Sequence, residues 1–174
     1  MLLEYFVELR DFFDKGGSVL FAIFAVLTLM WILILERLFF FLFRMKDLHD
    51  STLRDWEARQ DKSSWKAHKV RDAMVVTMRL LATKRIGLIR TLVAICPLLG
   101  ILGTVAGMIF VFDVITITGT GNARGMAAGI TKATLPTMAG LVASLSGLLC
   151  AVRLERAAQR AEEKLVDELQ IDTP

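Results

Sequence analysis

Three stretches of this sequence run for 20 or more residues without a charged side chain, and charged residues gather between them. They extend from Gly16 to Leu35, from Thr91 to Phe112 and from Ala133 to Val152. About 20 apolar residues are needed to cross the ~30 Å hydrocarbon core of a bilayer. A soluble helix would show a polar face, and none of these stretches has one. The pattern therefore predicts an all-α integral membrane protein with three transmembrane helices.

Shorter segments connect and flank these helices. The sequence predicts a surface segment at 1–17, transmembrane helices at 18–43, 86–118 and 125–152, connections at 44–85 and 119–124, and a C-terminal helix at 153–174. The first 17 residues mix aromatic and acidic side chains, whereas the start of a signal peptide would be basic. We therefore expect an amphipathic helix at the membrane surface in this segment.

The distribution of basic residues predicts the orientation. Net charge is only +3 and the pI is about 9.1, so the chain does not resemble a nucleic-acid-binding protein. Segment 44–85 holds eleven Lys and Arg residues against six acidic ones, while the 119–124 link holds only Arg124. Basic segments stay in the cytoplasm. Segments 44–85 and 153–174 are therefore predicted to be cytoplasmic, with the N-terminus and the 119–124 link on the opposite side.

The cytoplasmic segments show helical patterns. The stretch "VRDAMVVTMRLLATKR" has apolar residues at helical spacing, and no glycine or proline follows before Gly87. The tail carries a stripe close to a heptad repeat, formed by Leu154, Ala158, Ala161, Leu165 and Leu169. Two interpretations of this stripe stay open: a solvated helix held by salt bridges, or an extension of the spans that packs against neighbouring subunits.

Small residues are concentrated in the second and third spans. Gly100, Gly103 and Gly107 share one face of the second, and Gly140 and Gly147 lie on a similar face of the third. In lipid, small residues let two helix backbones approach closely. We therefore expect these faces to pack tightly, either within one subunit or between subunits.

Glycine packing does not account for two threonines beside these faces, Thr104 and Thr137. A threonine in a membrane helix commonly donates to a carbonyl one turn earlier. The alternative is that each hydroxyl lines a wet path, where it can hold water or meet a carboxylate. The residues alone do not decide between these roles.

Two stretches carry a family resemblance: "CPLLGILGTVAGMIFVF" and "GTGNARGMAAGITKATLPTMAGLVASLSGLL". They resemble the MotA/TolQ/ExbB proton-channel family, and most of all its ExbB branch. The resemblance implies a homopentamer in the bacterial inner membrane, with the second and third spans around a central pore. It also implies a single-span ExbD-like partner in that pore, whose aspartate takes up protons to energise a TonB-like protein. Thr104 and Thr137 would then take the positions of the pore threonines facing that aspartate.

Lys132, in "GITKA", departs from this family pattern, because many relatives place a glutamate there. A buried lysine in a membrane normally has a partner. Lys132 is therefore a candidate proton-pathway residue, paired with an acid of the partner subunit or with Asp113. The alternative is that its side chain extends to the outer interface.

Catalytic chemistry is not indicated. His49 and His68 are expected to be solvated, and Cys96 and Cys150 fall in apolar runs as small hydrophobic residues. Without a nucleophile, phosphate-binding or metal-ligand motif, we expect no enzyme activity, cofactor or metal. The predicted function is an ExbB-like motor subunit driven by proton motive force, which energises TonB-dependent transport. A TolQ-like or stator-like subunit with another load, or a membrane scaffold without transport activity, are the alternatives.

Overall fold

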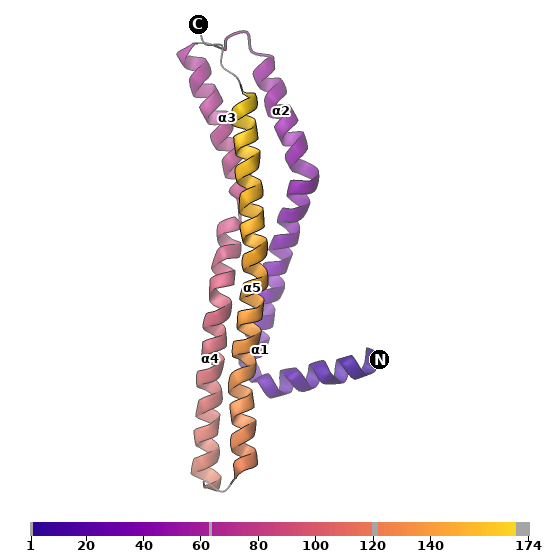
Figure 1. Ribbon diagram of the computed structural model, residues 1–174, viewed down its shortest axis with the longest axis vertical. Helices are drawn as coiled ribbons and strands as arrows, with labels where there is room; N and C mark the ends of the chain where they lie inside the picture. Colours follow the sequence, from indigo (N-terminus) through magenta and orange to yellow (C-terminus); the bar gives the residue numbers. More distant parts are fainter. Residues whose placement is uncertain (1, 63, 120–121, 170–174) are drawn as a thin grey trace. The chain divides into compact units, whose positions relative to one another are not determined.

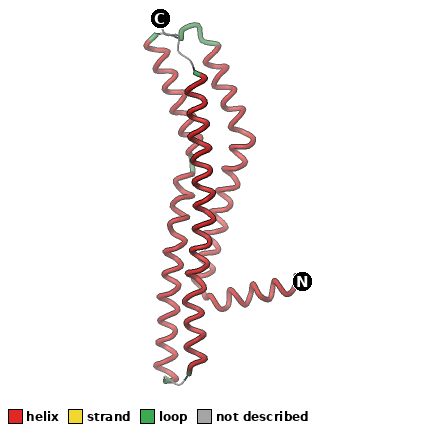
Figure 2. Tube along the Cα trace, in the orientation of Figure 1, coloured by secondary structure: helices red, strands yellow, loops and turns green. Residues whose placement is uncertain are grey.

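A computed structural model describes the backbone of residues 2–62, 64–119 and 122–169, and their side chains except at 2–9, 11, 15 and 118. Every regular element in these residues is helical (Figures 1 and 2). The elements are α1 (Leu2–Phe39), a π-helical turn η1 (Phe40–Arg44), α2 (Met45–Glu57), α3 (Trp65–Thr83), α4 (Ile86–Thr118) and α5 (Ala123–Glu168). Parts of the predicted 1–17, 119–124 and 153–174 segments lie outside the described residues. The predicted all-α fold is confirmed.

Three helical stretches are long and apolar enough to cross a membrane. They are Gly16–Glu57, Trp65–Ile117 and Ala123–Glu168. No more than 33% of the most apolar window in each stretch is buried by the rest of the chain. Most of this apolar surface therefore requires lipid or neighbouring protein, which agrees with the three predicted membrane helices.

Contacts divide the chain into two compact units. The first unit contains residues 1–31 and 90–148, and the second contains residues 32–89 and 149–174. The first unit therefore holds most of α4 and the first half of α5. The second unit holds the end of α1, η1, α2, α3 and the second half of α5.

In the first unit, α1 bends at Gly17 (Figure 1). Gly17 has φ +70°, a conformation that glycine adopts without the steric cost of a Cβ atom. Before the bend, Arg10 and Asp14 form an exposed ion pair at 3.9 Å. Phe13 stacks on Phe21 with ring centroids 4.8 Å apart. In this N-terminal stretch, the described charged side chains are thus exposed, and the described aromatic ones are half-buried.

The core of the first unit comes from α1, α4 and α5, and α4 lies antiparallel beside α5 (Figure 1). Its buried side chains include Leu20, Ile23 and Met30 of α1, Val93, Cys96 and Val111 of α4, and Ala133, Pro136 and Ala143 of α5. The α5 contributions are small, so its backbone can lie close to its neighbours. Cys96 is a buried free thiol, in line with its predicted role as a small hydrophobic residue.

In the second unit, four of the five residues of the C-terminal stripe are buried within the chain, and Ala161 is half-buried. Leu154, Ala158, Leu165 and Leu169 are each less than 7% exposed. Arg71 of α3 reaches the end of this helix, where its Nε donates to Leu169 O at 2.8 Å and its Nη2 donates to Val166 O at 2.9 Å. These bonds satisfy carbonyl groups that have no partner within the helix. Neither sequence interpretation anticipated this arrangement, because the chain itself covers these residues.

His49 corrects another expectation. It was predicted to be solvated, but it is only 8% exposed and lies 2.6 Å from Glu168 Oε2. This hydrogen bond is the main reason why the pKa of Glu168 falls below its usual value. The pair therefore fastens α2 to the end of α5. His68 is exposed, as predicted.

The junction between α3 and α4 also differs from the sequence expectation. The pattern predicted helix up to Gly87, but α3 ends at Thr83 and Arg85 adopts φ +67°. The side chain of Arg85 pairs with Glu36 of α1. Arg37 of α1 donates from Nη2 to the carbonyl of Leu81 at 2.9 Å, which caps the last turn of α3. Tertiary contacts with α1 thus stabilise a break at residues that carry no local signal for one.

Candidate functional site

Glycines occupy the contact between α4 and α5 in the first unit. A Cβ atom placed on Gly100 would lie 3.0 Å from Thr137 Cα, and one on Gly140 would lie 2.5 Å from Cys96 O. A Cβ on Gly107 would overlap the backbone of Ala133. In each case the obstacle is backbone, which cannot move aside as a flexible side chain can. The two helices therefore approach through surfaces that admit no larger residue.

Two further glycines extend this packing. A Cβ on Gly103 would collide with the ring of Pro136 on α5. A Cβ on Gly147 would collide with Met30 of α1 and lie 2.7 Å from Val93 Cγ2 of α4. The sequence left open whether these small faces meet within or between subunits. In the structure, their contacts lie within one chain.

The two candidate threonines differ in what their hydroxyls do. Thr137 Oγ1 donates across the helix contact to Gly100 O at 2.9 Å. Thr104 Oγ1 donates back along its own helix to Ile101 O at 2.6 Å. Both side chains are half-buried. Thr104 thus makes the local bond common to membrane threonines, whereas Thr137 joins α5 to α4.

Lys132 lies apart from this bond. Its Nζ sits 4.6 Å from the ring centroid of Phe110, which is a cation–π contact. Its Cε would be 2.9 Å from a Cβ on Gly17, so the stem of the side chain packs at the bend of α1. None of the ion pairs of the described residues joins Lys132 to Asp113, which is exposed. The proposed pair with Asp113 is therefore absent from this structure.

The outer surfaces of α4 and α5 are apolar. Side chains more than half exposed include Leu98, Ile101, Leu102, Val105, Ile109 and Phe112 of α4 and Met138, Leu141, Val142 and Leu145 of α5. Thr104 lies on α4 among this exposed set, next to Val105 and three residues after Ile101. The surface around Thr104 is thus available to lipid or to another protein chain.

Among the described residues, no group of three or more His, Cys, Asp or Glu side chains could hold a metal ion. Two buried polar residues were missed by sequence analysis, Arg37 and His49. His49 shares a helical spacing with buried Met45 and Trp56, which was an available signal.

Comparisons with known proteins point to one family. The model of the MotA/TolQ/ExbB proton channel family matches residues 44–167. Among curated proteins, the chain is 42% identical over 65 residues to a Synechocystis sp. protein named as biopolymer transport protein ExbB-like 1. It is 38% identical over 66 residues to ExbB-like 3 of the same organism.

The coverage of these relatives is partial. The first match covers 36% of this chain and 26% of the relative, and the second covers 37% and 31%. The matched part is thus less than a third of either relative's length. No solved structure matches this chain.

Proposed function

This chain belongs to the MotA/TolQ/ExbB proton channel family, and we propose that it is the ExbB-like subunit of an inner-membrane motor driven by proton motive force. In this proposal, five copies surround a pore that holds an ExbD-like single-span partner. Proton movement through the pore energises a TonB-like protein and hence transport across the outer membrane. The N-terminus is periplasmic and the C-terminus cytoplasmic, as the basic residues of segments 44–85 and 153–174 favour.

One observation carries the proposal: the α4–α5 contact uses its glycines within the chain and leaves Thr104 among exposed apolar side chains. Two helices that pack through their small residues leave their other faces free to contact lipid, neighbouring chains or a pore. The stretches that resemble ExbB lie in these two helices. The geometry therefore suits a pore-lining hairpin better than a single anchoring helix.

The energy source in this proposal is an ion gradient. Moving one charge through 100 mV provides about 2.3 kcal/mol, which is enough to bias a conformational step. A partner aspartate near Thr104 would alternate between its charged and neutral forms as it moves past successive subunits. The chain itself would supply hydroxyl groups, a rigid wall and cytoplasmic helices for assembly.

The direct test is proton flux in vesicles. We expect the chain reconstituted with its ExbD-like partner to admit protons when a membrane potential is applied, as measured with an entrapped pH-sensitive dye. Vesicles with either protein alone are the control, and native mass spectrometry of the same sample gives the number of copies. Absence of flux from the assembled pair would instead favour a scaffold. If the pair conducts protons but cells that depend on it do not grow on chelated iron, a TolQ-like or stator-like load would be favoured.

A second test concerns Lys132. In the proposed pore, the ammonium group of Lys132 would stabilise the charged form of the partner's aspartate. At a separation of about 4 Å and an effective dielectric of about 20, the attraction between the two charges is about 4 kcal/mol before the cost of desolvation is subtracted. Loss of this charge in Lys132→Met would raise the pKa of that aspartate. We therefore expect the pH dependence of TonB-dependent uptake to move to higher pH by about one unit, equivalent to about 1.4 kcal/mol. Lys132→Arg keeps the charge and should follow the parent.

Phe110→Leu provides the control for this second test, because it removes the ring beneath Lys132 Nζ but keeps the charge. Its pH profile should stay near that of the parent. Superimposable curves for the parent and both Lys132 variants would show that the residue has no part in the proton path.

A further inference from the structure

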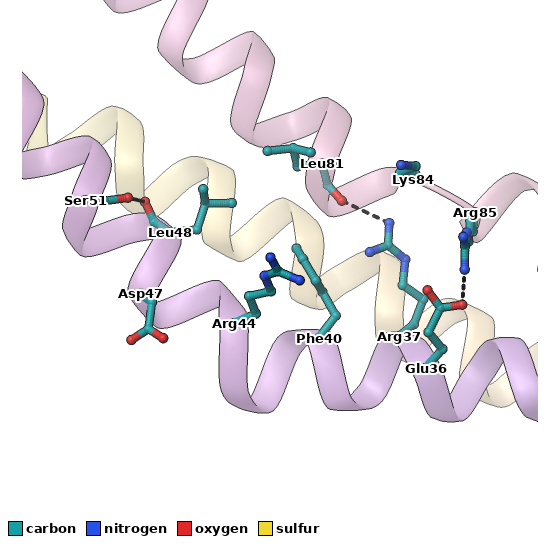
Figure 3. A pocket seen from close by; sticks show the side chains of 10 residues that line it. All are labelled: Glu36, Arg37, Phe40, Arg44, Asp47, Leu48, Ser51, Leu81, Lys84 and Arg85. Carbon is teal, nitrogen blue, oxygen red and sulfur yellow. Dashed lines mark hydrogen bonds and ion pairs between the residues drawn. The ribbon is translucent and has the colours of Figure 1, made fainter.

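A cavity of about 540 Å³ opens in the second unit (Figure 3). Its walls come from the end of α1, the π-helical turn η1, the start of α2 and the α3–α4 junction. Pockets that bind small molecules typically enclose about 300–1,000 Å³. The cavity is therefore large enough to hold a small polar group with room to spare.

The charges around this cavity are mainly positive. Four basic residues line it, namely Arg37, Arg44, Lys84 and Arg85, against two acidic ones, Glu36 and Asp47. Glu36 is paired with Arg85. Figure 3 shows the carboxylate of Asp47 pointing away from the guanidinium groups of Arg44 and Arg37. The remaining basic side chains thus face the cavity without a matching acid.

Arg37 is the most unusual of these residues because it is only 4% exposed. Its Nη2 donates to Leu81 O at 2.9 Å, and its guanidinium lies 4.9 Å from the ring centroid of Phe40. Its Nε is buried and donates to no acceptor among the described residues. A buried charged donor without an acceptor is costly, so such groups usually have a partner. Because Arg37 lines the cavity, an anion there would compensate its buried positive charge.

Two departures from regular backbone border the same cavity. Residues Phe40–Arg44 form a π-helical turn, a rare feature that is frequent at functional sites. Arg85 has φ +67°, which is unfavourable for a residue with a side chain. Strained conformations persist where surrounding contacts demand them. Arg44 ends the π-helical turn, Arg85 has the positive φ angle, and both side chains line the cavity.

The position of the cavity along the chain fits the headgroup level of a membrane. Arg44 directly follows the predicted span 18–43, and Arg85 directly precedes the predicted span 86–118. Phe39, Leu42 and Phe43 lie in the same unit and are each more than half exposed. These residues offer apolar surface beside a basic cavity, the combination that a lipid with a charged headgroup requires.

We propose that this cavity binds the phosphate group of an anionic phospholipid, with Arg44 and Lys84 as donors, the buried positive charge of Arg37 in the cavity wall and the exposed phenylalanines beside the acyl chains. Arginine matches phosphate because its planar guanidinium presents several donors to the phosphate oxygens. Lipid binding does not depend on proton coupling, so it can be tested independently of the proposed function. Free phosphate shares the same chemistry, and the experiment distinguishes the two sources.

The test titrates detergent-solubilised protein with phosphatidylglycerol or phosphatidylcholine and counts bound lipid by native mass spectrometry. We expect tighter binding of phosphatidylglycerol, and we expect Arg44→Gln or Lys84→Gln to weaken it about fivefold, as for the loss of one basic residue near anionic lipid. Both side chains are exposed, so their removal leaves the core intact. Arg153→Gln is the matched control, because Arg153 is exposed, directly follows the third uncharged run and lies outside the cavity.

Two outcomes would overturn the proposal: equal binding of the two lipids, or equal weakening by Arg44→Gln and Arg153→Gln. An added arm identifies the source of the phosphate. If excess inorganic phosphate displaces phosphatidylglycerol from the parent but not from Arg44→Gln, the cavity recognises the phosphate group alone. If the lipid stays bound in excess phosphate, its acyl chains contribute and the lipid is the ligand.

Discussion

Gly107→Ala is expected to destabilise the protein by about 2–3 kcal/mol, the upper part of the range for overpacking a close contact. The added methyl group would overlap the backbone of Ala133, so α4 and α5 must separate to admit it. The separation would also loosen the close contacts at Gly100 and Gly140 along the same pair of helices. The measurement is reversible unfolding in detergent, followed by helicity. Proton flux should fall together with stability.

Gly87→Ala is the matched control, since both glycines belong to α4 and receive the same methyl group. A Cβ atom on Gly87 would meet nothing within 4 Å. Alanine is favoured over glycine in a helix by about 1 kcal/mol, so this variant should be as stable as the parent or slightly more so. Equal destabilisation by both substitutions would show that the loss of stability does not come from the α4–α5 contact.

The membrane helices could be predicted because their signal is local and redundant. In the stretch from Gly16 to Leu35, every residue is uncharged, and no single position decides the outcome. The bend within α1 has a local cause as well, because Gly17 can adopt φ +70°. However, the same freedom exists at many glycines that stay helical, such as Gly107. Sequence alone therefore did not show which glycine would bend.

A boundary between the predicted segments 44–85 and 86–118 falls at the break between α3 and α4, but the contacts that cause the break could not be predicted, because they lie far away in the chain. Arg85 contacts Glu36, which is 49 residues earlier, and Leu81 O accepts from Arg37, which is 44 residues earlier. A local pattern contains no trace of such partners, and Gly87 was the nearest visible signal. The structure places Gly87 inside α4 instead.

The partner of the C-terminal stripe could not be predicted for a related reason. Its spacing correctly indicated a helix with one apolar face, but spacing does not identify the surface that covers that face. Arg71 of α3 and His49 of α2 bond to residues at the end of α5 that lie 98 and 119 residues later in the chain. Only the packing of α2 and α3 against α5 shows that the chain itself covers the apolar face of this helix.

The packing face of α4 could be predicted from the sequence, but the hydrogen-bond partners of the two candidate threonines could not. Glycine spacing gave the face of α4 that meets α5, since a helical repeat fixes which residues share a side. It did not separate the two threonines, which occupy similar places in their patterns. The acceptor of each hydroxyl depends on the depth of the neighbouring helix, and Gly100 O comes within reach of Thr137 only because Gly100 has no side chain to hold α5 away.

Thr137→Val should lower the stability of the α4–α5 pair and impair proton flux together. Valine keeps the shape of the side chain but removes the hydrogen bond to Gly100 O. Interhelical hydrogen bonds in membranes contribute about 0.6 kcal/mol on average and at most about 1.7 kcal/mol, so we expect a loss within this range. The measurements are unfolding in detergent and flux with the ExbD-like partner. Unchanged stability would mean that the hydroxyl is not needed for helix packing.

Thr104→Val separates packing from proton transfer more sharply. Its hydroxyl donates only to Ile101 O on its own helix, so its removal should leave stability unchanged. If Thr104 faces a partner carboxylate, flux should nevertheless fall by about tenfold, equivalent to about 1.4 kcal/mol in a transfer step. Thr28→Val is the control, because Thr28 Oγ1 makes the same kind of bond to Phe24 O in α1. Flux that matches the parent in both variants would show that Thr104 serves only its own helix, and the pore role would pass to Thr137 alone.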